Sequence, residues 1–362
     1  MLYQVPFAGT VSMLHSDIRH RLECAVAERI FPGCVFGVVN AEGEREVVCV
    51  GGYTYENDFA MFPEAVFDIA SLTKVIPTAC AALTLVDRGD LRLDSPVAAI
   101  LTNLVHSRAD RVTLHHLLTH TLDYRMPLSS LRDEKPRDLL DAVLREELSS
   151  EPGECFNYAN ATSILLGLVV ESVYGKTLDL CANELFFSRL DMNHTTFHPQ
   201  LYRSRVVVPT ENDPWRGEII VGEVHDESAW VLQQIMIPGS AGLFSTVPDL
   251  LTFLEMLLNK GIFRSRRYFS ESIIREMGTN QIPHLDDCTG LGWEMNQPRF
   301  MGKNSAQLIG KTGYTGCSLH LDLQRGVGCV LLSNRTWPQR TVTADAINEI
   351  RRDIADMVFS AG

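Results

Sequence analysis

The sequence lacks the features that mark membrane, secreted and nucleic-acid-binding proteins. No strongly apolar run reaches the roughly 18 residues of a spanning helix, and the run 164–170 is followed at once by Glu171. The N-terminus has no basic region ahead of an apolar core, so no secretory signal is visible and we expect a cytoplasmic protein. Lys and Arg number 32 against 45 Asp and Glu, and the net charge of −13 disfavours nucleic acid or anionic membranes as partners.

Disulfide and metal signatures are also missing. The nine cysteines are scattered without a CxxC pair, which fits buried free thiols better than a disulfide framework or a zinc site. His116 and His120 have a zinc-compatible spacing, but residue 117 is Leu where an HExxH motif needs its Glu. We therefore expect packed or partly solvated helix histidines, no metal and no organic cofactor.

Two further motifs are absent or incomplete. Gly310-Lys311-Thr312 resembles the end of a phosphate-binding loop, but Ser305 stands where that loop needs Gly, and a strand rather than a helix is predicted to follow. We therefore reject a phosphate-binding loop, and a nucleotide-binding function would rest on this rejected fragment alone. No GxSxG sequence occurs, so the hydrolase fold with that nucleophile elbow loses support.

Hydrophobic periodicity divides the 362 residues into strand-rich ends and a helical middle. Helical spacing, caps and stops predict helices at 13–30, 70–86, 114–120, 136–148, 160–174, 248–258 and 343–359. Apolar runs and alternation predict strands at 34–39, 46–50, 205–209, 219–221, 318–323 and 327–332, with one wet face on 318–323. We predict an α/β (α+β) fold in which an antiparallel sheet from both termini is flanked by helices. Its sheet domain is residues 1–90 and 206–362, and the inserted helical domain is 91–205.

A Ser-x-x-Lys sequence opens the helix predicted at 70–86. Residues three apart share one helix face, so the Ser71 hydroxyl and the Lys74 amine can meet. A serine hydroxyl needs a base to take its proton, and a lysine becomes such a base when burial or positive potential lowers its pKa. The following residues are apolar, so this lysine is expected to be buried, which is costly unless the amine has a function. Pro77 predicts a slight kink just beyond the site.

Two further groups complete the pattern: Tyr158-Ala159-Asn160 before an apolar helix, and Lys311-Thr312-Gly313 entering a strand. The three groups in this order resemble the serine penicillin-recognising hydrolases, above all the group of class C β-lactamases, D-Ala-D-Ala peptidases and family VIII esterases. The resemblance covers nearly the whole chain and also includes the sequences LLTHT (117–121), VHDE (224–227), AGLFST (241–246) and KTGYTG (311–316). It implies the β-lactamase/transpeptidase-like fold.

The resemblance implies roles for the catalytic groups. Ser71 is expected to be the acylated nucleophile and Lys74 its proton acceptor. Tyr158 is expected between Ser71 and the leaving group, as an anion or a proton relay shared with Lys74 and Lys311. Two flanking ammonium groups are the physical reason that a phenol could ionise near neutral pH.

It also implies roles for the substrate-binding groups. Asn160 is expected to donate its amide to the substrate acyl side chain and to help hold Lys74. Lys311 and Thr312 are expected to grip a substrate carboxylate or to polarise Tyr158, and Gly313 to let the strand approach the acyl group closely. The backbone N–H groups of Ser71 and Tyr314 would form the oxyanion hole.

Two stretches, 222–227 and 239–245, are similar to bacterial cell-wall relatives, namely D-Ala carboxypeptidase-like proteins and exo-acting muramoyl-L-alanine amidases. By this likeness His225 and Asp226 lie at the cleft edge and contact substrate; the alternative is a loop salt link that positions residues 222–245. The sequence departs from those relatives at three places, where they usually have His for Ser240, often His for Lys311, and Ser-Gly for Leu122-Asp123. These departures concern the substrate rather than the acyl-enzyme chemistry.

The sequence thus predicts an SxxK serine hydrolase that cleaves an amide or ester through an acyl-serine. The first choice is a penicillin-binding-protein-like peptidase, amidase or esterase acting on a small molecule or peptide, such as a D-Ala peptide, muropeptide, β-lactam or ester. A true class C-like β-lactamase, a serine acyltransferase and a non-catalytic ligand-binding relative remain as alternatives. The intact set of Ser71, Lys74, Tyr158 and Lys311 favours an enzyme over the last of these.

Overall fold

The computed structural model describes residues 7–56, 59–201, 206–341 and 343–360, with side chains described from residue 16 onward. Its centre is a six-stranded sheet with the strand order β2-β1-β12-β11-β10-β9, and every pairing in it is antiparallel. The strands are β1 (Gly33–Asn40), β2 (Arg45–Gly51), β9 (Glu294–Met295), β10 (Ile309–Thr312), β11 (Ser318–Asp322) and β12 (Val327–Ser333). The predicted sheet from both ends of the chain is therefore confirmed, because β1 lies directly beside β12.

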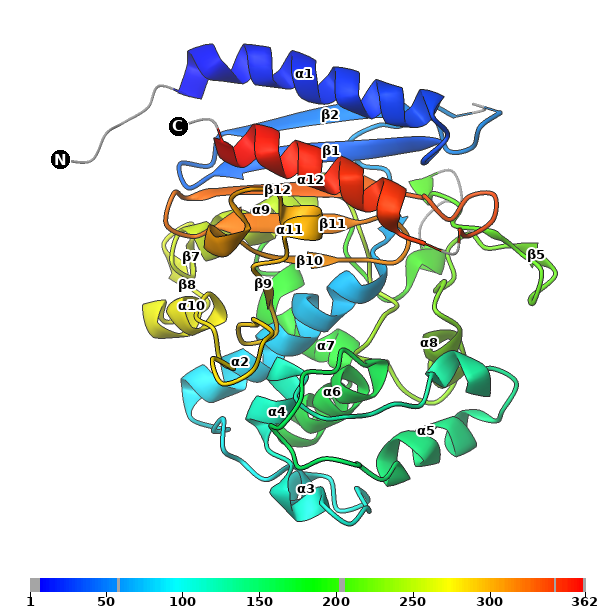
Figure 1. Ribbon diagram of the computed structural model, residues 1–362, viewed down its shortest axis with the longest axis vertical. Coiled ribbons are helices and arrows are strands. Elements are labelled where there is room, and N and C mark those ends of the chain that lie inside the picture. Colours follow the sequence, from blue (N-terminus) through cyan, green and yellow to red (C-terminus); the bar gives the residue numbers. More distant parts are fainter. Residues whose placement is uncertain (1–6, 57–58, 202–205, 342, 361–362) are drawn as a thin grey trace.

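Helices cover both faces of this sheet (Figure 1). One face carries α1 (Phe7–Ala27), α11 (Pro298–Met301) and α12 (Asp345–Ser360), whose apolar residues share a core with Phe36 and Leu331. The other face packs on α9 (Val247–Leu258) and joins the larger core that continues into the helical layer. The four-residue spacing of Ile18 and Leu22 in α1 places both side chains in the first of these cores.

The wet face predicted for β11 is wrong. All five residues of β11 are buried, because helices cover the sheet on both sides. His320 stacks on Phe300 of α11, with 5.7 Å between the ring centres. The carboxylate of Asp322 accepts the backbone N–H groups of residues 324 and 325 and so holds the turn into β12.

The region between the two halves of the sheet is helical where it is described. Its helices are α2 (Cys80–Arg88), α3 (Val97–Ile100), α4 (Leu114–Thr119), α5 (Pro136–Arg145), α6 (Asn160–Tyr174) and α7 (Leu178–Ala182), with short 3₁₀ or π turns at Ala109–Arg111, Leu128–Leu131, Asn183–Phe187 and Pro199–Leu201. These match the helices predicted at 114–120, 136–148 and 160–174, although α5 stops three residues earlier. The nucleophile segment passes from the sheet into this layer through α2 (Figure 1).

Short elements complete the chain. They are β3 (Phe67–Asp68) paired with β6 (Phe244–Ser245), β4 (Asn212–Asp213) with β5 (Glu218–Ile219), β7 (Ile262–Phe263) with β8 (Arg266–Arg267), and the helices α8 (Glu227–Leu232) and α10 (Glu271–Met277). The strand predicted at 205–209 begins at Arg205, outside the described residues, and continues only as a single parallel bridge between Val207 and Val66. The strand predicted at 219–221 is the two-residue β5, which begins one residue earlier.

The helix predicted at 70–86 is present but irregular. It begins as a 3₁₀ turn at Ala70–Lys74, continues as a π turn at Val75–Ala79 and becomes α-helical at α2. The predicted kink lies at Ile76, whose backbone leaves the helical region with φ −110° and ψ 107°. The run Ala70–Arg88, at 19 residues and a mean hydropathy of 1.2, is long and apolar enough to span a bilayer by length and composition alone. It is 83% buried inside the protein, as a core helix is.

Candidate active site

The Ser71 hydroxyl and the Lys74 amine meet at the start of this core helix. The Lys74 Nζ donates to the Ser71 Oγ at 2.9 Å and to the carbonyl of Ser240 at 2.8 Å. The 3₁₀ turn explains the contact, since side chains three residues apart eclipse one another in that conformation. Lys74 is only 3% exposed, so its amine is shielded from water and directed at the hydroxyl.

The backbone before Ser71 is held in an unusual conformation. Ala70 has φ +48°, in the left-handed region that a residue with a Cβ rarely adopts. The Asp68 carboxylate accepts the Ala70 N–H at 2.8 Å and the His225 N–H at 2.7 Å, and so ties the nucleophile segment to the loop across the cleft. Burial raises the pKa of Asp68, although these two N–H groups favour its ionised form.

Tyr158 lies between two lysines, just before α6. The Nζ atoms of Lys311 and Lys74 are 4.0 Å and 5.2 Å from the centre of its ring. Burial acts to raise the pKa of the phenol, but the positive charges of Lys311 and then Lys74 outweigh it and lower the pKa overall. Tyr158 is 40% exposed as a residue and lines the cleft, so a substrate can reach it there.

Lys311, on β10, is buried against a carboxylate. Its Nζ donates to Glu294 Oε1 on the neighbouring strand β9 at 2.7 Å, and the lysine is 1% exposed. Burial acts to lower the pKa of Lys311, but the negative charge of Glu294 raises it overall. This pairing leaves Lys311 beside Tyr158 with its charge already balanced, which favours a role in polarising the phenol over a grip on a substrate carboxylate.

His120 is a site residue that the sequence analysis missed. It ends α4 at φ +54°, is fully buried, and lies 4.9 Å from the Tyr158 ring, centre to centre. Its Nδ1 pairs with Thr162 Oγ1 at 2.6 Å, and burial followed by the nearby Lys311 and Lys74 lowers its pKa well below the usual value. His120 is thus a neutral support beneath Tyr158, whereas His116 accepts the Thr113 N–H at the start of α4. The sequence LLTHT was the signal that could have identified it.

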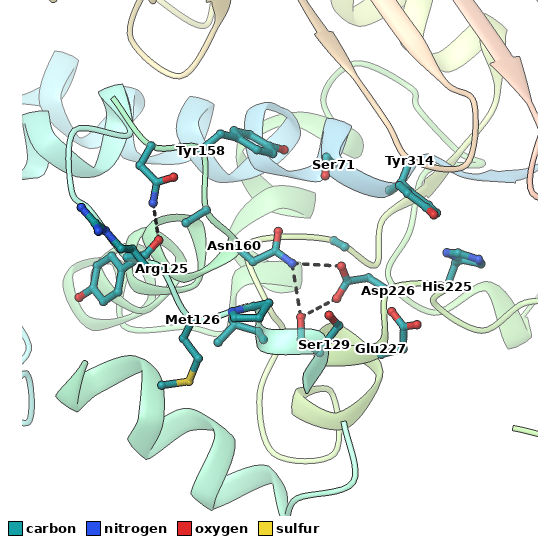
Figure 2. Close-up of a pocket in the computed structure, with 18 of the residues that line it drawn as sticks. Ser71, Arg125, Met126, Ser129, Tyr158, Asn160, His225, Asp226, Glu227 and Tyr314 are labelled. Atoms are coloured by element: carbon teal, nitrogen blue, oxygen red, sulfur yellow. Dashed lines mark hydrogen bonds between the residues drawn. The ribbon is translucent and has the colours of Figure 1, made fainter. Parts of the chain in front are cut away.

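Asn160 faces the cleft but does not hold Lys74. Its Nδ2 donates to Asp226 Oδ2 at 3.1 Å and to Ser228 Oγ at 3.4 Å (Figure 2). The predicted contact with Lys74 is replaced by the Ser240 carbonyl. Holding Lys74 would require Asn160 Oδ1 to accept from the ammonium group, and among the described residues Lys74 donates to Ser71 and Ser240 instead.

His225 and Asp226 both line the cleft and also brace its loop. His225 pairs with Glu211 at 2.7 Å, and its ring stacks on Tyr314 with 5.7 Å between centres. Asp226 caps α8 by accepting the Ala229 N–H at 2.9 Å. Burial opposes ionisation of Glu211, but hydrogen bonds from His225 and Arg340 lower its pKa to about 2. A position at the cleft edge and a bracing role for the loop 222–245 are therefore compatible for His225 and Asp226.

The turn after β10 is pressed against the nucleophile segment. A Cβ added to Gly313 would lie 2.6 Å from the carbonyl oxygen of Ile69, so this close approach requires glycine. Arg351 of α12, itself buried, donates to the carbonyls of Gly313 and Cys317 at 2.9 and 2.8 Å. Thr312, the last residue of β10, pairs with Ser318 of β11.

The Tyr314 backbone belongs to the turn that lies against the Ser71 segment, where the predicted oxyanion donor is expected. Arg335 Nε donates to the Tyr314 carbonyl at 2.8 Å. Within the described part of the chain, no partner is found for the Tyr314 N–H. A free N–H group next to the nucleophile can stabilise the charge that develops on a carbonyl oxygen during acyl transfer.

These groups open onto one cleft of about 620 Å³ (Figure 2). Ser71, Tyr158, Asn160 and Tyr314 line its inner side, and Met126 and Arg125 stand on the facing wall. In the ranges that the structure describes, no group of three His, Cys, Asp or Glu side chains could hold a metal ion. The cleft is lined by a hydroxyl, a phenol of lowered pKa and a backbone N–H without a partner among the described residues, and two buried amines lie behind them.

Several known proteins are similar to this chain over most of its length. A protein of Escherichia coli O157:H7, provisionally named a D-alanyl-D-alanine carboxypeptidase, is 29% identical over 302 residues, which cover 74% of this chain and 69% of that protein. The octameric penicillin-binding protein homologue from Pyrococcus abyssi is 25% identical, with a TM-score of 0.68 over 90% of this chain and 73% of its own.

Other solved structures show the same fold. EstCE1, described as a hydrolase with promiscuous acyltransferase activity, aligns with a TM-score of 0.75 at 21% identity over 96% of this chain and 98% of its own. A mutant of simvastatin synthase from Aspergillus terreus aligns with 0.72 at 18% identity over 99% of both chains. The family model described as Beta-lactamase matches residues 18–352. The chain therefore belongs to the β-lactamase family, whose members share this serine-hydrolase fold.

Proposed function

We propose that this protein is a serine hydrolase that cleaves an amide or ester bond through an acyl-Ser71 intermediate. The observation that carries the proposal is the 2.9 Å contact between the Lys74 amine and the Ser71 hydroxyl, next to a phenol of lowered pKa. Such a pair of nucleophile and base within hydrogen-bond reach is what covalent acyl transfer requires.

In the proposed mechanism, Ser71 Oγ attacks the substrate carbonyl carbon while its proton passes to Lys74 or, when ionised, to Tyr158. The carbonyl oxygen becomes negative and is stabilised by the backbone N–H groups of Ser71 and Tyr314. As the tetrahedral intermediate collapses, Tyr158 protonates the leaving amine or alcohol, and the acyl group stays on Ser71. A water molecule, deprotonated by the same groups, then attacks the ester and restores the free hydroxyl.

The substrate proposed first is a peptide, amide or ester of the kind handled by penicillin-binding-protein-like peptidases, amidases and esterases. The names of the carboxypeptidase relatives support a peptide ending in D-alanine. The fold shared with EstCE1 and simvastatin synthase supports an acyltransferase as the second candidate. In that reaction an alcohol or thiol, instead of water, attacks the acyl-enzyme. The first choice and the transferase share the same acyl-enzyme.

The test is active-site labelling. Wild-type protein is expected to take up one equivalent of a fluorophosphonate or a fluorescent penicillin, and Ser71→Ala to take up none. Undiminished labelling of the variant would falsify the assignment of the nucleophile. Intact mass spectrometry with β-lactams, p-nitrophenyl esters and muropeptides then follows how fast each adduct decays. Slow decay of a β-lactam adduct would indicate a penicillin-binding protein, and fast decay would indicate a β-lactamase. Rapid decay of an ester or muropeptide adduct would indicate a hydrolase of that substrate.

A further inference from the structure

One carboxylate in the cleft has no ion-pair partner among the residues that the structure describes. Of the charged side chains that line it, Arg125 is 3.5 Å from Asp123, while Arg340 and Glu227 pair with each other at 2.7 Å. Within the described residues, Asp226 alone among these lining carboxylates and guanidinium groups forms no salt bridge. Its formal negative charge is therefore left for something that enters the cleft.

The Asp226 side chain is nevertheless held firmly, by neutral donors. Its Oδ1 accepts from Ser228 Oγ at 2.6 Å and from the Ala229 N–H at 2.9 Å, and its Oδ2 accepts from Asn160 at 3.1 Å. These bonds fix the direction of the carboxylate without cancelling its charge. Figure 2 shows Asp226 and Asn160 directed toward each other below Ser71.

Two arginines of this region are already paired with carboxylates. Arg340 also bonds Glu211, and Arg216 contacts Asp213 at 3.4 Å, buried between two tryptophan rings. The carboxyl group of Asp68 lies close behind, near enough for the two acidic groups to repel each other. The corner formed by Asn160 and Asp226, which we call the acidic corner, therefore favours a positive group over a negative one.

We propose that the acidic corner selects substrates carrying a positive charge, such as an amine or quaternary ammonium group, within reach of Asp226 when the scissile carbonyl is at Ser71. This proposal rests on the proposed function and names the substrate class of that site. A fixed, partly desolvated carboxylate attracts a cation more strongly than the same pair in bulk water, and it disfavours a substrate carboxylate at the same place.

The test uses two pairs of isosteric substrates. One pair carries the charge on the acyl part: the p-nitrophenyl ester of γ-butyrobetaine and its analogue with tert-butyl in place of trimethylammonium. The other carries it on the leaving group: acetylthiocholine and its tert-butyl analogue. The value of kcat/KM is measured for all four with the wild type, with Asp226→Asn, and with Glu223→Gln, which removes a carboxylate on the same loop outside the cleft lining.

In at least one pair, kcat/KM of the wild type and of Glu223→Gln is expected to be roughly ten-fold higher for the cationic substrate than for its tert-butyl analogue. This factor is the scale of one partly screened charge contact. Asp226→Asn keeps a side chain suited to capping α8, so it is expected to fold, to react with fluorophosphonate and to lose the preference.

The pair that shows the preference indicates whether the acidic corner binds the acyl part or the leaving group of the substrate. Equal rates within both pairs, with Ser71 still acylated, overturn the acidic corner but leave the hydrolase intact. Failure to acylate Ser71 at all overturns both.

Discussion

The buried ammonium group of Lys311 lies between Glu294, at 2.7 Å from Oε1, and the Tyr158 ring, at 4.0 Å from its centre. One lysine thus balances a carboxylate and lowers the pKa of a phenol at the same time. Glu294 acts in the opposite direction on Tyr158 and raises its pKa. Glu294 on β9 therefore moderates the lowering of the Tyr158 pKa that Lys311 and Lys74 cause.

Glu294→Gln tests this arrangement through pH dependence. Removing the negative charge takes away an influence that raises the pKa of Tyr158 and one that raises the pKa of Lys311. Both limbs of a plot of kcat/KM against pH, measured with p-nitrophenyl butyrate, are expected to move to lower pH. The matched control is Glu255→Gln, whose carboxylate pairs with Arg45 and is 17% exposed against 15% for Glu294. If the two variants have the same profile, Glu294 does not tune the site.

Lys74 is expected to be needed for acylation as a base and not only as a charge. Lys74→Ala should slow the reaction of Ser71 with fluorophosphonate by roughly 10²-fold or more, the usual scale for losing a general base. Lys74→Arg keeps the positive charge but has no proton-accepting form at neutral pH, so it should be impaired similarly. Thermal unfolding checks that both variants are folded. A Lys74→Arg protein that acylates at the wild-type rate would make Lys74 an electrostatic group.

Gly313→Ala is expected to damage the oxyanion hole. The new Cβ meets the Ile69 carbonyl oxygen at 2.6 Å and must push the turn that carries the Tyr314 N–H away from Ser71. Loss of one such donor typically costs about 10²–10³ in kcat. Gly278→Ala is the control, since its nearest neighbour is a side-chain methyl of Leu323 at 3.1 Å, which can move. If the esterase rates of Gly313→Ala and Gly278→Ala fall equally, the loss comes from general strain and not from the oxyanion hole.

Stability is expected to depend on pH through His320. Burial, with help from Arg351, lowers its pKa to about 3, while the unfolded chain has an ordinary value near 6.5. Between these two values only the unfolded state binds the proton, so the free energy of unfolding falls as pH falls, by at most roughly 1.4 kcal/mol per pH unit from this group. His320→Phe keeps an aromatic ring against Phe300 and should show a shallower loss in urea unfolding between pH 7 and pH 5. Parallel losses in both proteins would contradict this account.

The sequence predicted the parts of the site that rest on local patterns. Ser71 and Lys74 are three residues apart, Tyr158 precedes a regular apolar helix, and the sheet follows from apolar runs at both ends of the chain. The structure brings all of these together, although their catalytic roles stay predictions until they are measured.

The parts that sequence reasoning missed depend on contacts between distant segments. Glu294 meets Lys311 only because β9 pairs with β10, and nothing near residue 294 in the sequence indicates such a partner. His120 lies beneath Tyr158 because α4 ends in a left-handed residue and turns back toward α6. The prediction of a solvent-exposed face on β11 failed for the same reason, because an alternating sequence pattern cannot reveal that helices from elsewhere in the chain cover the strand.

Arg351 extends from α12 to the carbonyls of Gly313 and Cys317, beside the proposed oxyanion donor. The turn that completes the cleft is therefore fastened by a residue made 280 positions after the nucleophile. During synthesis, Ser71 and Lys74 leave the ribosome long before this fastening is available. The turn therefore gains this support only in a chain synthesised past residue 351, and a truncation before α12 is expected to leave the turn without it.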